Sequence, residues 1–158
     1  MKRLLIFFFI VSSLQITAQN SGETNGSPKF DPAANPENDL RTAVEQAKKE
    51  NKRIILDVGG EWCIWCHRID SFIEGHEAIN KFLHANYVVL KINYSEENKN
   101  EKFLSNYPKV NGYPHFFVLE KNGKLLHSQD TGLLEKEKSY DETRMMDFLK
   151  KWAPKKKA

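Results

Sequence analysis

Cysteine is scarce in this sequence, which has only Cys63 and Cys66 among 158 residues. A chain of this length suits one domain. Such a domain buries roughly two thirds of its unfolded surface, so it needs no disulfide in order to fold. The two cysteines are therefore available for chemistry.

The sequence also lacks an apolar run that could span a bilayer, which takes about 20 residues. The run Leu4–Val11 is short, follows Lys2 and Arg3, and is succeeded by small and polar residues. This pattern indicates a secretory signal peptide over residues 1–19, and its length disfavours a membrane anchor. We therefore expect an exported protein, periplasmic or extracellular, in an oxidising compartment where a disulfide persists.

A large net charge is absent as well. The formal net charge is +3, and removal of Lys2 and Arg3 with the signal peptide lowers it to +1. This balance implies no nucleic-acid partner. Residues 155–158 form a locally basic end that we interpret as a solvated tail.

Hydrophobic periodicity and turn signals divide the rest of the chain. Residues 20–36 are rich in Asn, Gly, Ser and Pro, which predicts a flexible linker before a domain over residues 37–154. In the domain we expect helices and strands in alternation, and Asn122-Gly123 predicts a hairpin between the last two strands. The expected helices are 37–50, 63–75, 77–86, 96–107 and 140–152, and the expected strands are 53–58, 87–94, 115–120 and 124–129.

This order of elements predicts the fold class. Strands that alternate with helices pair in parallel, and the closing hairpin adds an antiparallel edge. We therefore expect a three-layer α/β/α sandwich with a mixed central sheet.

The spacing of the two cysteines predicts redox chemistry. Residues three apart at the start of a helix face the same side, within reach of disulfide closure. The helix dipole lowers the pKa of the first thiol, so Cys63 is the expected exposed nucleophile. Cys66, one turn deeper, is the expected resolving thiol, and together they form the disulfide Cys63–Cys66.

The surrounding residues resemble the thioredoxin superfamily. The stretch "LDVGGEWCIWC" is similar to the family's strand, loop and helix, and "VNGYP" is similar to the loop that carries its cis-proline. The resemblance extends from Asp39 to Trp152 in element order. Within the superfamily, the sequence most resembles exported members, including the soluble reductase domain of the transmembrane thiol:disulfide interchange proteins.

The resemblance implies roles for residues near the pair. Asp57 matches the buried aspartate that relays a proton to and from the resolving cysteine, and a buried carboxyl has a raised pKa that suits this task. Pro114 matches the cis-proline that faces the pair and leaves backbone groups free for a substrate strand. Trp62 and Tyr113 flank these two loops and are expected to contact substrate.

Two dipeptides depart from the family pattern. Ile64-Trp65 replaces the Gly-Pro of cytosolic thioredoxins and the Gly-His or Pro-His of isomerases and oxidants. Gly59-Gly60 replaces the usual aromatic and small residue. The sequence therefore does not decide the direction of the reaction.

Three other interpretations of the cysteines remain. "CIWCH", residues 63–67, satisfies the attachment signature of c-type haem, although an α/β pattern is unlike the mostly helical small cytochromes. A zinc site would need further ligands, and the other histidines are scattered without ligand spacing. A structural disulfide in a non-catalytic binding module would close only a tiny loop and so constrain the unfolded chain little.

The sequence thus predicts an exported thiol–disulfide oxidoreductase. Of the two directions we favour an enzyme that reduces protein disulfides. Its expected catalytic residues are Cys63, Cys66 and Asp57. We expect no cofactor beyond the dithiol and no metal. The expected partners are protein disulfides or thiols and a membrane redox protein that recycles the dithiol. We expect a monomer, since the sequence has no room for a dimerisation domain.

Overall fold

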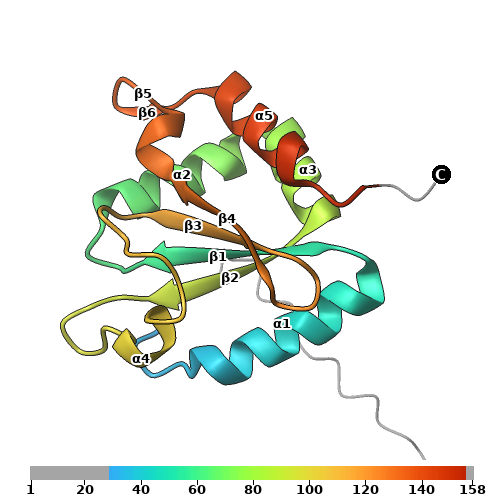
Figure 1. Ribbon diagram of the computed structural model, residues 1–158. Helices are drawn as coiled ribbons and strands as arrows, with labels where there is room; N and C mark the ends of the chain where they lie inside the picture. Colours follow the sequence, from blue (N-terminus) through green and yellow to red (C-terminus); the bar gives the residue numbers. More distant parts are fainter. Residues whose placement is uncertain (1–28, 156–158) are drawn as a thin grey trace, which may run out of the picture.

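A four-stranded mixed sheet forms the centre of the protein, whose computed structural model describes residues 29–155 (Figure 1). The strands lie in the order β2-β1-β3-β4. β1 and β2 pair in parallel, whereas β3 is antiparallel to both β1 and β4. Their bounds are Arg53–Gly59 for β1, Tyr87–Asn93 for β2, His115–Leu119 for β3 and Leu125–Asp130 for β4.

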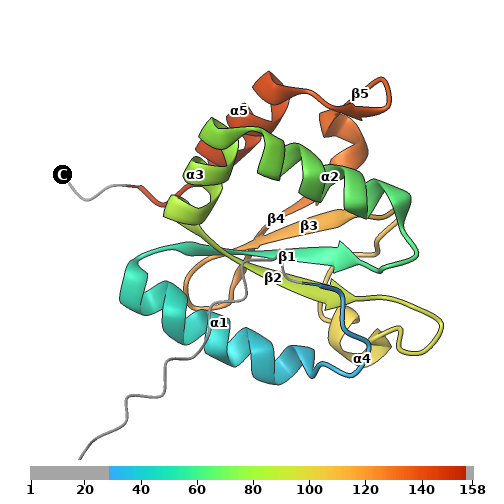
Figure 2. The ribbon, with the colours of Figure 1, turned by 180° about the vertical axis from the view of Figure 1, so that it is seen from behind.

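Helices cover both faces of this sheet (Figures 1 and 2). α1 (Pro36–Glu50) and α4 (Glu101–Leu104) lie on one face. The other face carries α2 (Ile64–Gly75), α3 (Glu77–Asn86) and α5 (Glu142–Trp152). The three-layer α/β/α sandwich with a mixed sheet is therefore confirmed.

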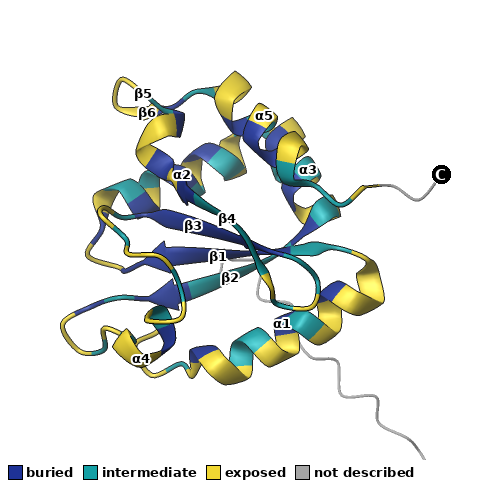
Figure 3. Cartoon of the chain, in the orientation of Figure 1, coloured by how far each residue is buried: buried dark blue, intermediate teal, exposed yellow. Residues whose placement is uncertain are grey.

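β1 lies at the centre of the core. All of its residues after Arg53 are buried, and its side chains alternate between the two faces of the sheet. Ile54, Leu56 and Val58 pack under α1, whereas Ile55 packs under α2 and α5. Figure 3 shows the buried strands between helices whose outer faces are exposed. A strand buried on both faces reads as a continuous apolar run, which is why the sequence predicted it well.

Caps set the ends of the main helices. The Asn35 side chain accepts a hydrogen bond from the Asn38 N–H (2.9 Å), and Pro36 occupies the first turn of α1. Asp141 does the same for α5, accepting from the Arg144 N–H at 3.0 Å.

The region between β2 and β3 contains less helix than expected. The sequence predicted a helix over 96–107, but α4 covers only Glu101–Leu104. Asn100 has a left-handed backbone (φ 47°) and its side chain donates to the Asn93 carbonyl at 2.8 Å. Asn98 accepts from the Asn100 N–H at 2.9 Å, so asparagine side chains hold the preceding residues in turns.

A short segment after β4 was also missed. A 3-10 turn, η1 (Thr131–Leu134), leads into a small hairpin of β5 (Glu135–Lys136) and β6 (Ser139–Tyr140). The helix expected from residue 140 therefore begins at Glu142. Two-residue strands have no period that a sequence pattern can reveal.

The predicted linker needs a correction at its described end. Phe30 is only 3% exposed and belongs to a core cluster, so residues 29–36 are not a flexible linker. A single aromatic ring among polar residues makes no periodic pattern, yet it buries a large apolar area. The signal peptide, residues 20–28 and the last three residues of the basic tail lie outside the described residues.

Residues 29–155 contain no helix that is both long enough and apolar enough to cross a membrane.

Candidate functional site

The two cysteines are joined at the point where β1 passes into α2. β1 ends at Gly59, and Cys63 is the N-cap of α2. Cys63 and Cys66 form a disulfide, with Sγ–Sγ 2.30 Å and Cα–Cα 5.2 Å. The Cys66 N–H also donates to Cys63 Sγ at 3.1 Å. An N–H at a helix start stabilises nearby negative charge, so this contact favours a thiolate on Cys63 after reduction.

Both sulfur-bearing residues are buried in this disulfide form. Cys63 is 4% exposed and Cys66 is fully buried. The expectation that Cys63 is exposed is therefore wrong for this state, although it is the more accessible of the two. Phe30, Trp65 and Tyr113 pack around the pair and cover it.

Close neighbours leave no room for a side chain at Gly59 or Gly60. A Cβ on Gly59 would lie 2.4 Å from Cys66 Sγ and 3.0 Å from the Phe30 ring. A Cβ on Gly60 would lie 2.4 Å from the Trp62 indole nitrogen and 2.8 Å from the Tyr94 carbonyl oxygen. Glycine at both positions lets the disulfide, Phe30 and Trp62 approach the backbone closely.

An aromatic surface borders the disulfide and contains two of the predicted substrate contacts. Trp62 is 59% exposed, donates through Nε1 to the Tyr94 carbonyl (2.7 Å), and meets the edge of Tyr113 at 5.8 Å between ring centroids. Tyr94 stacks on Tyr113 at 4.7 Å. Burial, together with the neighbouring Tyr94, raises the pKa of Tyr113 to about 12, so this phenol stays neutral at physiological pH. The surface offers exposed apolar area to a partner.

Pro114 follows Tyr113 directly, and the peptide bond between them is cis. The Pro114 carbonyl accepts a hydrogen bond from the Thr131 hydroxyl, which anchors this loop to η1. Trp62 thus contacts Tyr113, Tyr113 packs against the disulfide, and Pro114 follows Tyr113 in the chain.

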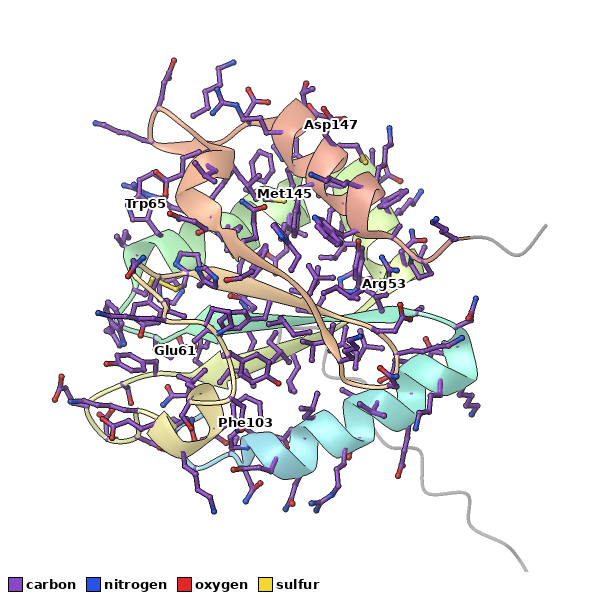
Figure 4. All side chains as sticks on the ribbon, viewed as in Figure 1. Arg53, Glu61, Trp65, Phe103, Met145 and Asp147 are labelled. Carbon is purple, nitrogen blue, oxygen red and sulfur yellow. A yellow bond between two sulfur atoms is a disulfide. The ribbon has the colours of Figure 1, made fainter. Side chains whose placement is uncertain are left out.

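Three charged residues meet between β1, β2 and α2. Lys91 Nζ of β2 is 2.7 Å from Asp57 Oδ2 of β1 and 2.6 Å from Asp70 Oδ1 of α2. The Asp57 and Lys91 side chains are each 4% exposed, whereas that of Asp70 is 24% exposed. Because Cys66 and Asp70 are four residues apart in α2, both lie on the helix face that meets this part of the sheet. Figure 4 shows how densely side chains fill the space between α2 and the sheet.

Asp57 has an unusual environment for a carboxyl group. Its Oδ1 is buried and has no hydrogen-bond partner among the described residues. Burial raises the pKa of Asp57, the charge of Lys91 opposes this, and Asp70 adds to it. Burial lowers the pKa of Lys91, but the two carboxylates outweigh it and the net direction is upward. Lys91 therefore stays charged, while Asp57 is suited to take up and release a proton.

Three residues of this site were missed by sequence reasoning. Lys91 carried a signal, since a lysine inside the apolar strand "YVVLKINY" needs a partner. Asp70 carried a weaker one, its four-residue spacing from Cys66. Phe30 carried none, because it reaches the site from a segment without a periodic pattern.

The histidines near the site do not gather around the sulfurs. His67 is exposed and its Nε2 lies 2.8 Å from the Glu61 carbonyl oxygen. His115 is buried with its Nε2 2.8 Å from Ser128 Oγ, and burial lowers its pKa. Within residues 29–155 no three His, Cys, Asp or Glu side chains are grouped as metal ligands.

Residues 40–144 match the family model of the thioredoxin-like domain. The chain belongs to the thioredoxin-like family. The match covers β1, the disulfide, the cis-proline loop and most of the sandwich, so the resemblance seen in the sequence is confirmed.

Known structures share this fold. The disulphide isomerase from Xylella fastidiosa Temecula1 superposes with a TM-score of 0.66 at 22% identity, over 77% of this chain and 94% of that one. The oxidised C-terminal domain of DsbD from Neisseria meningitidis gives 0.57 at 16% identity, over 79% and 99%. The thioredoxin-like chain thus shares its fold with a disulphide isomerase and with the C-terminal domain of DsbD.

Curated relatives match over a short segment. Spermatogenesis-associated protein 20 of Mus musculus is 37% identical over 54 residues, which are 34% of this thioredoxin-like chain but only 7% of the relative. The chain therefore corresponds to a small part of that much longer protein.

Proposed function

We propose that this thioredoxin-like protein is an exported enzyme that reduces disulfides in other proteins. The observation that carries the proposal is the disulfide at the N-cap of α2 with a buried, partly unpartnered carboxyl behind it. The fold shared with disulfide oxidoreductases supports it. The apolar run after Lys2-Arg3 supports export to the periplasm or cell exterior.

The first half-reaction starts from the reduced dithiol. The Cys63 thiolate, stabilised by the Cys66 N–H, attacks one sulfur of a substrate disulfide. The substrate S–S bond breaks, its other sulfur leaves as a thiolate that takes a proton, and a mixed disulfide forms. Trp62 and Tyr113 provide the apolar surface for the substrate segment, and Pro114 shapes the groove.

The second half-reaction releases the product. Asp57 accepts the proton of the Cys66 thiol, and the resulting thiolate attacks Cys63 Sγ. The mixed disulfide breaks and the second substrate sulfur leaves and is protonated. Two electrons have then moved to the substrate together with two protons, one from Cys66 through Asp57 and one from solvent in place of the proton that Cys63 had already released. The enzyme ends as the Cys63–Cys66 disulfide seen in the structure. A membrane redox partner returns two electrons to begin the next cycle.

The remaining interpretations of the cysteines fit the geometry less well. Attachment of c-type haem needs both sulfurs as thioethers, whereas here they bond to each other and His67 contacts a loop carbonyl. A binding module with a structural disulfide gives no reason for the buried group around Asp57. No observation favours either over the redox role.

Reduction of insulin disulfides by the purified protein, with dithiothreitol as reductant, tests this proposal. We expect Cys63→Ser to abolish the activity and Cys66→Ser to accumulate mixed disulfides, which mass spectrometry detects. Lys81→Met, a change of an exposed residue on α3, serves as the control. Full activity of Cys63→Ser would refute the mechanism, and a disulfide that dithiothreitol cannot reduce would favour the binding module.

A further inference from the structure

The segment before α1 lies across the rear of the disulfide. Its Phe30 N–H donates to Glu61 Oε1 at 2.9 Å, and its Pro32 carbonyl accepts from Asn98 Nδ2 at 2.9 Å. In Figure 2 this segment, drawn in blue, runs beside the carboxyl ends of β1 and β2. Two hydrogen bonds therefore hold it against the loops that follow these two strands.

The Phe30 ring contacts both parts of the redox site. It packs in one cluster with Cys63 and Cys66, and its centroid lies 4.5 Å from Lys91 Nζ. It also occupies the space into which a side chain at Gly59 would project. The ring is 3% exposed, so it fills this space and excludes water from it.

We propose that Phe30 is a positioning residue for the resolving half-reaction, whose ring shields Cys66 and the buried Lys91–Asp57 pair from water. This role rests on the proposed disulfide-reductase function. It assigns a task to a residue that lies far from the cysteines in sequence.

The physical reason is the dependence of this site on low polarity. An apolar, water-free contact strengthens the interaction of Lys91 with its two carboxylates and with the face of the ring. It also keeps Asp57 in the environment that raises its pKa. Loss of the ring would admit water to Lys91, to Asp57 and to the resolving sulfur.

The test measures how fast iodoacetamide alkylates Cys66 in the Cys63→Ser protein, where Cys66 is the remaining thiol. We expect Phe30→Ala to raise the rate by about tenfold through local opening. Phe30→Leu keeps an apolar side chain and should return the rate close to that of the parent. Leu133→Ala, at an exposed residue of η1, is the matched control and should leave the rate unchanged.

Two results would overturn the proposal: an unchanged rate in Phe30→Ala, or an increase that Phe30→Leu fails to reverse. Urea midpoints of all variants show whether opening is local or global. If Phe30→Ala does not fold, Glu61→Ala provides the same test, since it removes the acceptor of the Phe30 N–H; an unchanged rate there would also count against the proposal. The alkylation rate does not depend on reductase activity. A wild-type protein that fails to reduce insulin would therefore contradict the proposed function, whereas the alkylation rates would still test the shielding by Phe30.

Discussion

Two charged residues of β1, Arg53 and Asp57, lie four positions apart and both form ion pairs, yet their environments differ. The Arg53 guanidinium is 3.2 Å from Glu120 Oε2 and donates through Nη1 to the Trp152 carbonyl at 2.8 Å. It ties the start of β1 to the hairpin and to the end of α5. Figure 4 places Arg53 at the end of the sheet opposite Glu61 and Trp65.

Asp57 is less completely satisfied. Lys91 Nζ donates a hydrogen bond to Asp57 Oδ2 and another to Asp70. Asp57 Oδ1 has no partner among the described residues. Arg53 keeps some contact with solvent, with 16% of its side chain exposed, whereas Asp57 has almost none. Arg53 and Asp57 therefore have different roles on the same strand. A satisfied pair holds the fold, and an incompletely satisfied buried carboxyl is available for proton transfer.

Among these changes, removal of Lys91 should have the largest effect on the environment of Asp57. In Lys91→Met the two carboxylates lose their shared cation, and we expect the free energy of unfolding at neutral pH to fall by about 3–5 kcal/mol. The loss should shrink at acid pH, where Asp57 holds a proton and needs no cation. Urea unfolding at both pH values measures it. Lys81→Met, which breaks an exposed pair with Glu77, should leave the midpoint unchanged. An equal loss at both pH values would mean that Lys91 stabilises the fold by packing alone.

Replacement of Asp57 should affect catalysis more than folding. Without a group to take the Cys66 proton, we expect Asp57→Ala to lower insulin turnover by about 100-fold while the circular dichroism spectrum is retained. Asp147→Ala changes an exposed carboxyl on α5 and should turn over normally. A rate close to wild type for Asp57→Ala would remove Asp57 from the mechanism.

Arg53→Met tests the structural role of the other charged residue of β1. The Trp152 carbonyl would lose its donor and Glu120 its partner, which we expect to lower the free energy of unfolding by about 1–2 kcal/mol. Insulin turnover should stay at the wild-type rate, because Arg53 lies at the far end of β1. Arg41→Met, on the exposed face of α1, is the matched control. A catalytic defect in Arg53→Met without loss of stability would show that the two ends of the strand are coupled.

The sequence predicted those parts of the site that are local in the chain. The spacing of Cys63 and Cys66, the buried strand before them and the loop before Pro114 are short patterns with a direct physical meaning. β1, β2 and β3 followed in the same way, because each carries its own apolar run, and the Asn122-Gly123 turn signalled the hairpin that adds β4. The hydrogen bonds of Asn98 and Asn100 shortened the expected helix after β2, since side chains that bind the backbone compete with helix formation.

The parts that escaped prediction depend on contacts between distant segments. Phe30 reaches a space that exists only because Gly59 has no side chain, and the two residues are far apart in the chain. Lys91 meets Asp57 through the parallel register of β1 and β2, which no local pattern specifies. The departure at Gly59-Gly60 was visible in the sequence, but its compensation by an aromatic ring from another segment was not.

The most gradual expected effect is the dependence of stability on pH. The pKa of Asp57 is raised above its ordinary value of 3.8, so the folded protein keeps a proton that the unfolded chain has released. Stability must therefore fall as pH rises from 3.8 towards the raised value, by up to about 1.4 kcal/mol per pH unit.

The comparison of wild type with Asp57→Asn isolates this effect, because asparagine cannot ionise. The other titratable groups that face Asp57 are Lys91, Asp70 and Tyr140, and all three are common to both proteins. We expect the difference in free energy of unfolding, wild type minus variant, to decrease as the pH rises above 3.8 in urea titrations. A difference that increases over this range would mean that Lys91 lowers the pKa of Asp57. The carboxyl would then resemble Arg53 as a structural partner rather than a proton acceptor.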